Sequence, residues 1–142
     1  MFAKQLSVFI ENRQGRLGEV LNVLGKSGVN ILSMSLADTT EYGLLRLIVS
    51  DPEQGKKELT EAGFSSLLSD VLVLQIPHKV GSLQSLLKAI EAAGVNIEYM
   101  YGLSIDDADA YVVLKASEVE KTEQVLAENG VKTLTNEQIK AL

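Results

Sequence analysis

The 142-residue sequence predicts an α+β fold built from two consecutive units, each in the order strand, helix, strand, strand, helix, strand. Three observations predict this fold. One apolar pattern occurs twice, strand-type and helix-type periodicities alternate in the same order in both copies, and glycines end the helices at matching positions. We take the first unit as residues 1–69 and the second as residues 70–142.

The repeat is most visible in the four residues GVNI, which occur at positions 28–31 and again at 94–97. A shift of 66 residues also places Gly15 on Gly81 and Leu17 on Leu83. Further on, the shift becomes 67 residues and places Ser50 on Ser117. We expect the extra residue to lie in a loop, where insertions are usually tolerated.

The first strand and the first helix of each unit follow from periodicity. Residues 6–10 alternate apolar side chains on one face, and the apolar run at 71–76 is their counterpart. Apolar side chains then recur at the spacing i, i+3, i+4, i+7 of one helix face. These are Leu17, Val20, Leu21 and Leu24 in the first unit and Leu83, Leu86, Leu87 and Ile90 in the second. Gly28 and Gly94 end these helices.

Two strands and a second helix complete each unit. We expect strands at 30–37 and 44–49, and at 96–104 and 110–115. Capping boxes then open the second helices at Ser50 and Ser117, although Asp51 with Gln54 forms a competing box one residue later. Gly63 and Gly130 end these helices, and short final strands follow at 65–69 and 131–135.

This element order is the ferredoxin-like arrangement, an antiparallel four-stranded sheet with both helices on one face. Because almost no linker separates the units, we expect their second strands to pair and form one sheet of eight strands. In the second unit, alternation places Ile97, Tyr99 and Tyr101 on one face of that strand. A second chain would then cover the open face of the sheet, which predicts a homodimer.

Composition excludes several classes of function. The net charge of −6 and the pI of about 4.8 disfavour nucleic acid and anionic membrane surfaces as partners. The absence of cysteine excludes disulfides and thiolate chemistry. No apolar stretch approaches the roughly 20 residues of a membrane span, and the first residues do not resemble a signal peptide, so we expect a cytoplasmic protein.

Catalytic residues are scarce. The chain has a single histidine, His78, and no glycine-rich phosphate-binding motif. Asp106, Asp107 and Asp109 cluster in a hairpin without the glycine and terminal glutamate of a calcium loop, so we interpret them as a solvated turn. We therefore expect no enzyme, no cofactor and no metal site.

The turn between the first strand and the first helix is the candidate binding site in each unit. A helix N-terminus presents unpaired N–H groups and the positive end of the helix dipole, which suit a carboxylate. Gly15 and Gly81 allow a ligand to approach the backbone closely. The alternative interpretation is that each glycine only forms the turn.

These residues resemble the ACT domain, an amino-acid-sensing module of many biosynthetic enzymes. The match consists of Asn12, Gly15, Leu17, Gly28, Asn30 and Ile31 in the first unit and of Gly81, Leu83, Gly94, Asn96 and Ile97 in the second. Gln14 and Val80 stand where the family often has proline, and His78 where it usually has asparagine or aspartate. The resemblance implies a free-standing, non-catalytic regulatory protein.

The resemblance also implies that a free amino acid binds where ACT units meet. N–H groups near Gly15 would receive its carboxylate, and Asn12 or Asn30 its ammonium group. Ile31, Ser33 and Met34 would border the ligand side chain, although Leu17 and Ile31 equally suit the core. The residues implied as ligand-binding are Asn12, Arg13, Gln14, Gly15, Arg16, Leu17, Asn30, Ile31, Met34, His78, Gly81, Ser82, Leu83, Asn96 and Ile97. If only one unit binds, we expect it to be the first, because Arg13 and Arg16 flank its turn.

Two alternatives remain open. In the first alternative, the chain is a ligand-free interaction module that docks a metabolic enzyme through the long, fairly apolar edge strand at 30–37. An RNA-recognition module of the same topology would need exposed aromatic residues and a basic face, for which only Tyr99, Tyr101 and Tyr111 are available. Neither the identity of the amino acid nor the regulated partner follows from the sequence.

Overall fold

The computed structural model describes residues 1–38 and 42–142, which form two compact units. The N-terminal unit consists of Lys4–Ser69. The C-terminal unit consists of Asp70–Leu142 together with Met1–Ala3. No helix among the described residues is long and apolar enough to cross a membrane.

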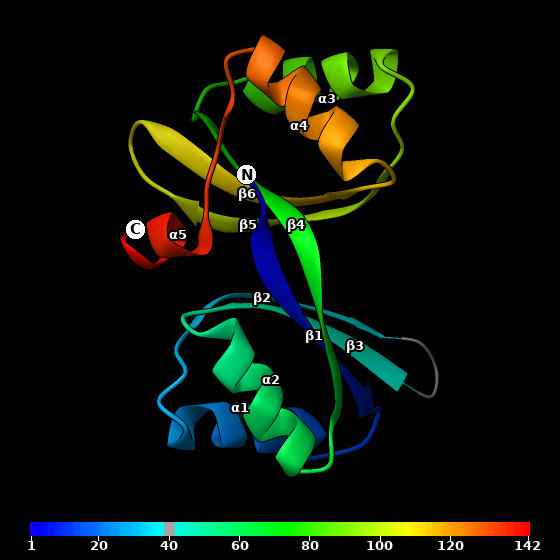
Figure 1. The fold of residues 1–142 in the computed structure, drawn as a ribbon, viewed down its shortest axis with the longest axis vertical. Helices are drawn as coiled ribbons and strands as arrows, with labels where there is room; N and C mark the ends of the chain where they lie inside the picture. Colours follow the sequence, from blue (N-terminus) through cyan, green and yellow to red (C-terminus); the bar gives the residue numbers. More distant parts are fainter. Residues whose placement is uncertain (39–41) are drawn as a thin grey trace. The chain divides into compact units, whose positions relative to one another are not determined.

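The N-terminal unit places two helices on one face of antiparallel strands (Figure 1). Its elements are β1 (Ala3–Glu11), α1 (Arg16–Lys26), β2 (Ile31–Asp38), β3 (Tyr42–Val49), α2 (Pro52–Glu61) and the first residues of β4 (Ser65–Pro77). β3 lies between β1 and β2, with Leu47 opposite both Leu6 and Met34. β1 also neighbours β4.

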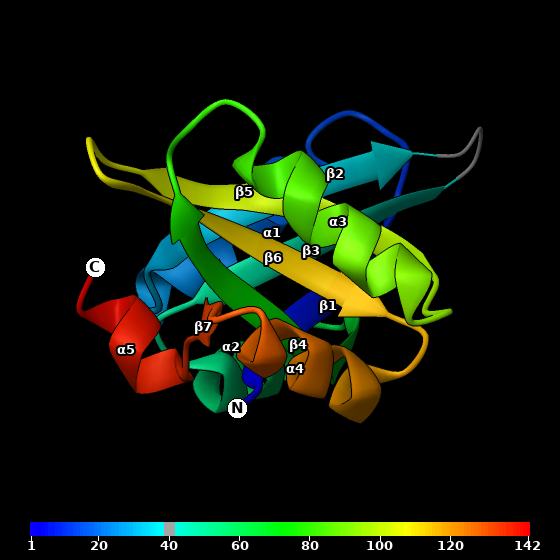
Figure 2. The same cartoon turned by 90° about the horizontal axis from the view of Figure 1, so that it is seen from above.

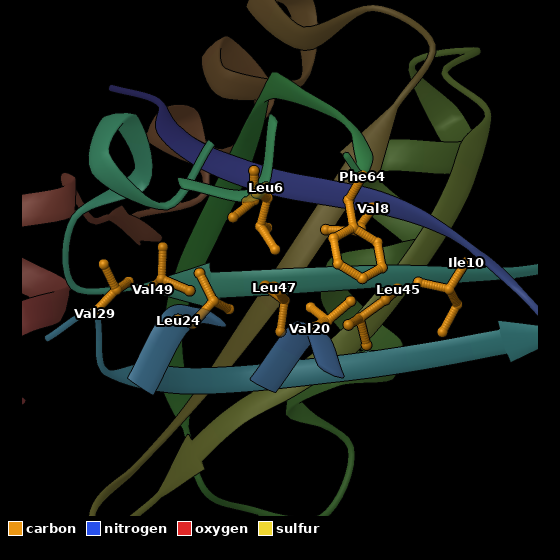
Figure 3. Packing of buried hydrophobic residues seen from close by; sticks show 11 residues of the cluster. Leu6, Val8, Ile10, Val20, Leu24, Val29, Leu45, Leu47, Val49 and Phe64 are labelled. Atoms are coloured by element: carbon orange, nitrogen blue, oxygen red, sulfur yellow. The ribbon is translucent and has the colours of Figure 1, made fainter. Parts of the chain in front are cut away.

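The core of the N-terminal unit fills the space between these strands and helices (Figure 3). Alternate residues of β1 and β3 face the helices, as the period of two requires. They meet Val20 and Leu24 from α1, together with Leu59 and Phe64. α2 approaches the sheet closely at Gly55, because a Cβ atom there would lie 3.1 Å from a Leu6 methyl carbon.

The C-terminal unit repeats this arrangement, with α3 and α4 over one face of its strands (Figure 2). Its elements are the rest of β4, α3 (Ser82–Ala92), β5 (Ile97–Ile105), β6 (Asp109–Ala116), α4 (Val119–Glu128), β7 (Lys132–Thr133) and α5 (Asn136–Lys140). β6 lies between β4 and β5, and β7 pairs with β4. Phe2 packs against the core of this unit. The predicted α+β fold with two ferredoxin-like units is confirmed.

The strands between the units differ from the prediction. The short strand expected at 65–69 and the strand expected at 71–76 are one strand, β4, of 13 residues, so the described chain has seven strands and not eight. The predicted pairing between the second strands is wrong, since β2 pairs with β3 and β5 with β6, and the two stand at opposite ends of the strand order. Neither glycine nor proline interrupts positions 65–76, so the chain continues in extended conformation through Ser69 and Asp70.

β-bulges change which side chains share a face of β5. The register shifts between Ile97 and Tyr99 and again between Gly102 and Ser104. A bulge inserts an unpaired residue and reverses the alternation beyond it. Ile97 therefore shares its face with Met100 and not with Tyr99, contrary to the prediction. β2 shows only the first of these shifts, so the extra residue of the second repeat lies in the second bulge of β5 and not in a loop.

The predicted serine caps are also wrong. The N-cap of α2 is Asp51, whose side chain accepts a hydrogen bond from the Gln54 N–H. The competing box therefore named the correct N-cap residue. The N-cap of α4 is Glu118, without a side-chain cap. The hydroxyls of Ser50 and Ser117 instead accept the backbone N–H of Asn30 and Asn96, which fixes the start of the second strand in each unit.

Candidate functional site

The candidate site of the N-terminal unit begins at the turn between β1 and α1. Gly15 is the N-cap of α1 and has a φ of 87°, in the left-handed region that favours glycine. Glycine has no side chain that could cap the helix. The N–H groups of Leu17 and Gly18 in the first turn therefore have no acceptor inside the helix and point out of its N-terminus.

The same turn is built in the C-terminal unit. Gly81 also has a φ of 87° and caps α3 without a side-chain hydrogen bond. Three backbone bonds recur at matching positions. In the first turn, the N–H groups of Arg13, Arg16 and Glu19 donate to the carbonyl oxygens of Glu11, Arg13 and Gly15 at 2.8, 3.4 and 3.0 Å, respectively. In the second turn, the N–H groups of Lys79, Ser82 and Ser85 donate to the carbonyl oxygens of Pro77, Lys79 and Gly81 at 2.9, 3.2 and 3.0 Å. Two different sequences thus produce one turn geometry.

A hollow of about 300 Å³ opens beside the first turn. It is lined by Ile10, Glu11, Asn12, Arg13, Leu17, Leu36 and Gly43, from the end of β1, the turn, α1, β2 and β3. Ile10 is buried, whereas Leu36 is 47% exposed. The hollow therefore joins a polar rim from the turn to an apolar floor from the sheet.

Two opposite charges stand at the rim of this hollow. The Arg13 Nε lies 2.8 Å from a Glu11 carboxylate oxygen, and both side chains are largely exposed. An exposed ion pair of this kind contributes little to stability. Both groups therefore remain accessible to a ligand that carries one charge of each sign.

Arg16 lies elsewhere. Its guanidinium stands 4.5 Å from the centre of the Phe64 ring, in a cation–π contact, and one nitrogen lies 2.6 Å from the Glu19 carboxylate. Its side chain is only 18% exposed, and it does not line the hollow. The structure thus gives Arg16 a role in packing α1 against the core, which residue type alone did not indicate.

The second turn has different surroundings. Gly81 and Leu83 line a wide hollow of about 570 Å³ along the exposed side of α3. Ser82 lines another of about 320 Å³, between α3 and the segment that follows α4. His78 is exposed and donates its backbone N–H to the carbonyl oxygen of Ala108.

Asp106 stabilises the hairpin between β5 and β6, to which the backbone N–H of His78 is hydrogen-bonded. Its carboxylate accepts the backbone N–H groups of Ala108 and Asp109 at 2.9 and 2.7 Å. These two hydrogen bonds hold the pKa of Asp106 below its ordinary value, with a smaller contribution from the Tyr111 hydroxyl. Burial and the two nearby carboxylates raise the pKa of Tyr111. Asp106 thus shapes a turn by binding backbone groups.

The remaining predicted residues lie at the start of the second strands. Asn30 and Asn96 are exposed and are bound through their backbone to Ser50 and Ser117. Ile31 and Ile97 pack against the two cores, and Met34 is 40% exposed on β2. The structure therefore brings Asn12, Arg13 and Leu17 together at one hollow beside Gln14 and Gly15, and it places Arg16, Asn30, Ile31 and Met34 outside the lining.

Four residues of the hollow were missed in the sequence. Ile10 and Leu36 belong to strands whose alternation predicts a face but not a neighbour. Glu11 continues the polar turn by one residue, so its proximity to Arg13 was a usable signal. Gly43 carries no side-chain signal, and only the strand register, which pairs it with Ile10, places it at the floor.

Comparisons with known proteins agree with this geometry. A family model described as "ACT domain pair" matches residues 1–142. The solved structure of protein BT0572 from Bacteroides thetaiotaomicron is 39% identical, with a TM-score of 0.94, covering 100% of this chain and 98% of that one. No curated protein matches.

More distant structures share the fold. The regulatory subunit of aspartate kinase from Thermus thermophilus, in its ligand-free form, is 16% identical with a TM-score of 0.62 over 88% of this chain and 91% of that one. The corresponding subunit from Thermus flavus is 17% identical with a TM-score of 0.59 over 88% and 90%. On the match over its full length, this chain belongs to the ACT domain pair family, whose two units form a regulatory module.

Proposed function

We propose that this protein is a non-catalytic regulator that binds a free amino acid at the β1–α1 turn of its N-terminal unit. One observation carries the proposal. The uncapped start of α1 and the Glu11–Arg13 pair border the same hollow of about 300 Å³. Membership in the ACT domain pair family supports the regulatory role.

The rim is complementary to a zwitterion. An α-carboxylate is a natural guest of the N–H groups at the start of α1, where the helix dipole adds to the guanidinium charge of Arg13. Glu11 and Asn12 also line the hollow, so their side-chain oxygens are the acceptors proposed for the ammonium group. Charge-assisted hydrogen bonds of this kind are stronger than neutral ones, so a small ligand gains both affinity and orientation.

Calorimetric titration with each of the twenty amino acids at millimolar concentration tests this proposal. We expect at least one to bind wild type, and Arg13→Ala to weaken that binding at least about tenfold, because a charge-assisted hydrogen bond is lost. Lys26→Ala, at the other end of α1, is the matched control and should bind like wild type.

The opposite outcomes are equally clear. If no amino acid binds, the proposal fails, and docking of a partner enzyme through β2, which exposes Met34 and Leu36, becomes the better explanation. If an amino acid binds equally well to Arg13→Ala and to wild type, the ligand is not held at this turn.

The proposal includes a homodimer. β2 and β5 stand at the two ends of the strand order, and a long edge strand with few charges is a template for pairing with another chain. Light scattering at micromolar concentration is expected to give about twice the chain mass. A mass near 15.4 kDa would contradict the dimer.

A further inference from the structure

Among the residues that the structure describes, the side chains at the floor of the N-terminal hollow are all apolar. Ile10, Leu17 and Leu36 supply aliphatic side chains, and Gly43 supplies none. The charged groups, Glu11 and Arg13, stand at the rim and are paired with each other. A charged ligand side chain on this floor would lose its hydration without gaining a partner, which is costly.

Gly43 leaves room for Ile10 and Leu36 to pack over it at the floor. It lies opposite Ile10 on β1, in a buried position of β3. A Cβ atom there would lie 3.1 Å from the Ile10 Cγ1 and 3.3 Å from the Leu36 Cδ1, closer than ordinary contact. Ile10 and Leu36 therefore fold over the space that a side chain at position 43 would occupy, and they form a continuous apolar surface.

The C-terminal unit has the reverse order of larger and smaller residues at the two corresponding positions. The repeat and the register place Gly102 where Leu36 stands, and Ala110 where Gly43 stands. Ala110 lies opposite Ile76 and carries a methyl group where Gly43 has none, and Gly102 has no side chain where Leu36 carries an aliphatic one. Each unit thus combines one larger residue with one glycine at these two positions. The first unit has Leu36 with Gly43, and the second has Gly102 with Ala110.

From this exchange we infer that the N-terminal hollow selects an amino acid with an aliphatic side chain, and that Leu36 and Gly43 determine this specificity. The inference rests on the proposed function. A hollow of about 300 Å³ stands at the lower end of the roughly 300–1,000 Å³ of ligand pockets, which suits a ligand of the size of one amino acid. The second unit has Gly102 at the position of Leu36 and is not expected to share this preference.

The test exchanges the two packings. The double variant Leu36→Gly with Gly43→Ala gives the first unit the pattern of the second. Removing the Leu36 side chain relieves its 3.3 Å contact with the new methyl group, whereas the 3.1 Å contact with Ile10 remains. Calorimetry compares leucine, isoleucine and valine with glycine, aspartate and lysine. We expect an aliphatic amino acid to bind wild type at least about tenfold more tightly than the other three, and the double variant to lose at least about tenfold in that affinity.

Two controls separate specificity from folding. Ser35→Ala, on the opposite face of β2 from Leu36, should bind like wild type. The single variant Leu36→Ala, which keeps a strand-compatible residue, should also weaken aliphatic binding, and circular dichroism shows whether each variant is folded.

The outcomes distinguish the two proposals. If a charged or very small amino acid binds most tightly and depends on Arg13 but not on Leu36, the specificity inference is overturned while the proposed function survives. If no amino acid binds to wild type, both are overturned.

Discussion

At the scale of single residues, Gly15 and Gly25 differ in backbone conformation and not in the space around them. Gly15 has a positive φ, yet a Cβ atom there would have no other atom within 4 Å. Any cost of a side chain at this position is therefore backbone strain. Gly25, inside α1, has equally open surroundings but no positive φ.

This contrast predicts opposite signs for one type of substitution. Gly15→Ala should destabilise the protein by about 1–2 kcal/mol, the cost of a left-handed conformation for a residue with a Cβ atom. Gly25→Ala should stabilise it by roughly 0.5–1 kcal/mol, because alanine loses less entropy in a helix. Urea unfolding measures both, and a destabilising Gly25→Ala would contradict the assignment of helix and turn.

Asp106 makes the hairpin of the C-terminal unit sensitive to pH. Its folded pKa is lower than the ordinary value of 3.8, so its stabilising effect is complete above that pH and is lost as the pH falls through the folded pKa. Asp106→Ala should therefore lower the melting temperature at neutral pH, and the difference from wild type should shrink as the pH falls below 3.8.

Asp107→Ala is the control, because the two backbone hydrogen bonds go to Asp106. A difference that stays constant from neutral to acid pH would show that the charge of Asp106 has no part in the effect.

At the scale of elements, the two second helices reach their sheets through different residues. Gly55 of α2 is buried against Leu6 and Leu24. The repeat places Thr122 of α4 at the same position, where it is fully buried and its hydroxyl donates to the Glu118 carbonyl. α2 therefore has no room for the side chain that α4 carries.

Gly55→Thr should destabilise the protein by about 1–3 kcal/mol, the usual cost of overpacking, despite the gain in helix propensity. Denaturant unfolding measures this cost. An unchanged or increased stability would show that Leu6 and Leu24 can move aside without loss.

The sequence predicted these elements better than their contacts. Local periodicity identified α1 to α4, most strands and the turn glycines, because a side chain's face depends on neighbours a few residues away. It missed the short helix α5. The bulge between Ile97 and Tyr99, the position of Ser50 and the continuity of β4 depend on strand partners far along the chain. For the same reason the turn was predicted, whereas Leu36 and Gly43 were not.

At the scale of the whole molecule, the chain passes from one unit to the other inside strands. It leaves the C-terminal unit after Ala3, within β1, and returns to it after Ser69, within β4. Neither passage is a flexible linker. Loss of structure in one unit would therefore break strands that the other unit needs.

We accordingly expect one thermal transition, with equal calorimetric and van't Hoff enthalpies. Leu24→Ala, in the N-terminal core, should cost about 2–5 kcal/mol and move the whole transition to lower temperature. Two transitions, of which only one moves in this variant, would contradict the coupling.

The continuity of β4 also determines where the chain tolerates changes of length. Leu68 packs against the N-terminal core, whereas Leu72 and Leu74 belong to the C-terminal core, all at even spacing along one strand. One residue inserted between them would turn the side chains of one core outward, since successive residues face opposite sides. β5, an end strand, absorbed its extra residue in a bulge. Over evolutionary time, insertions and deletions should accumulate at the end strands, while the length of β4 stays constant.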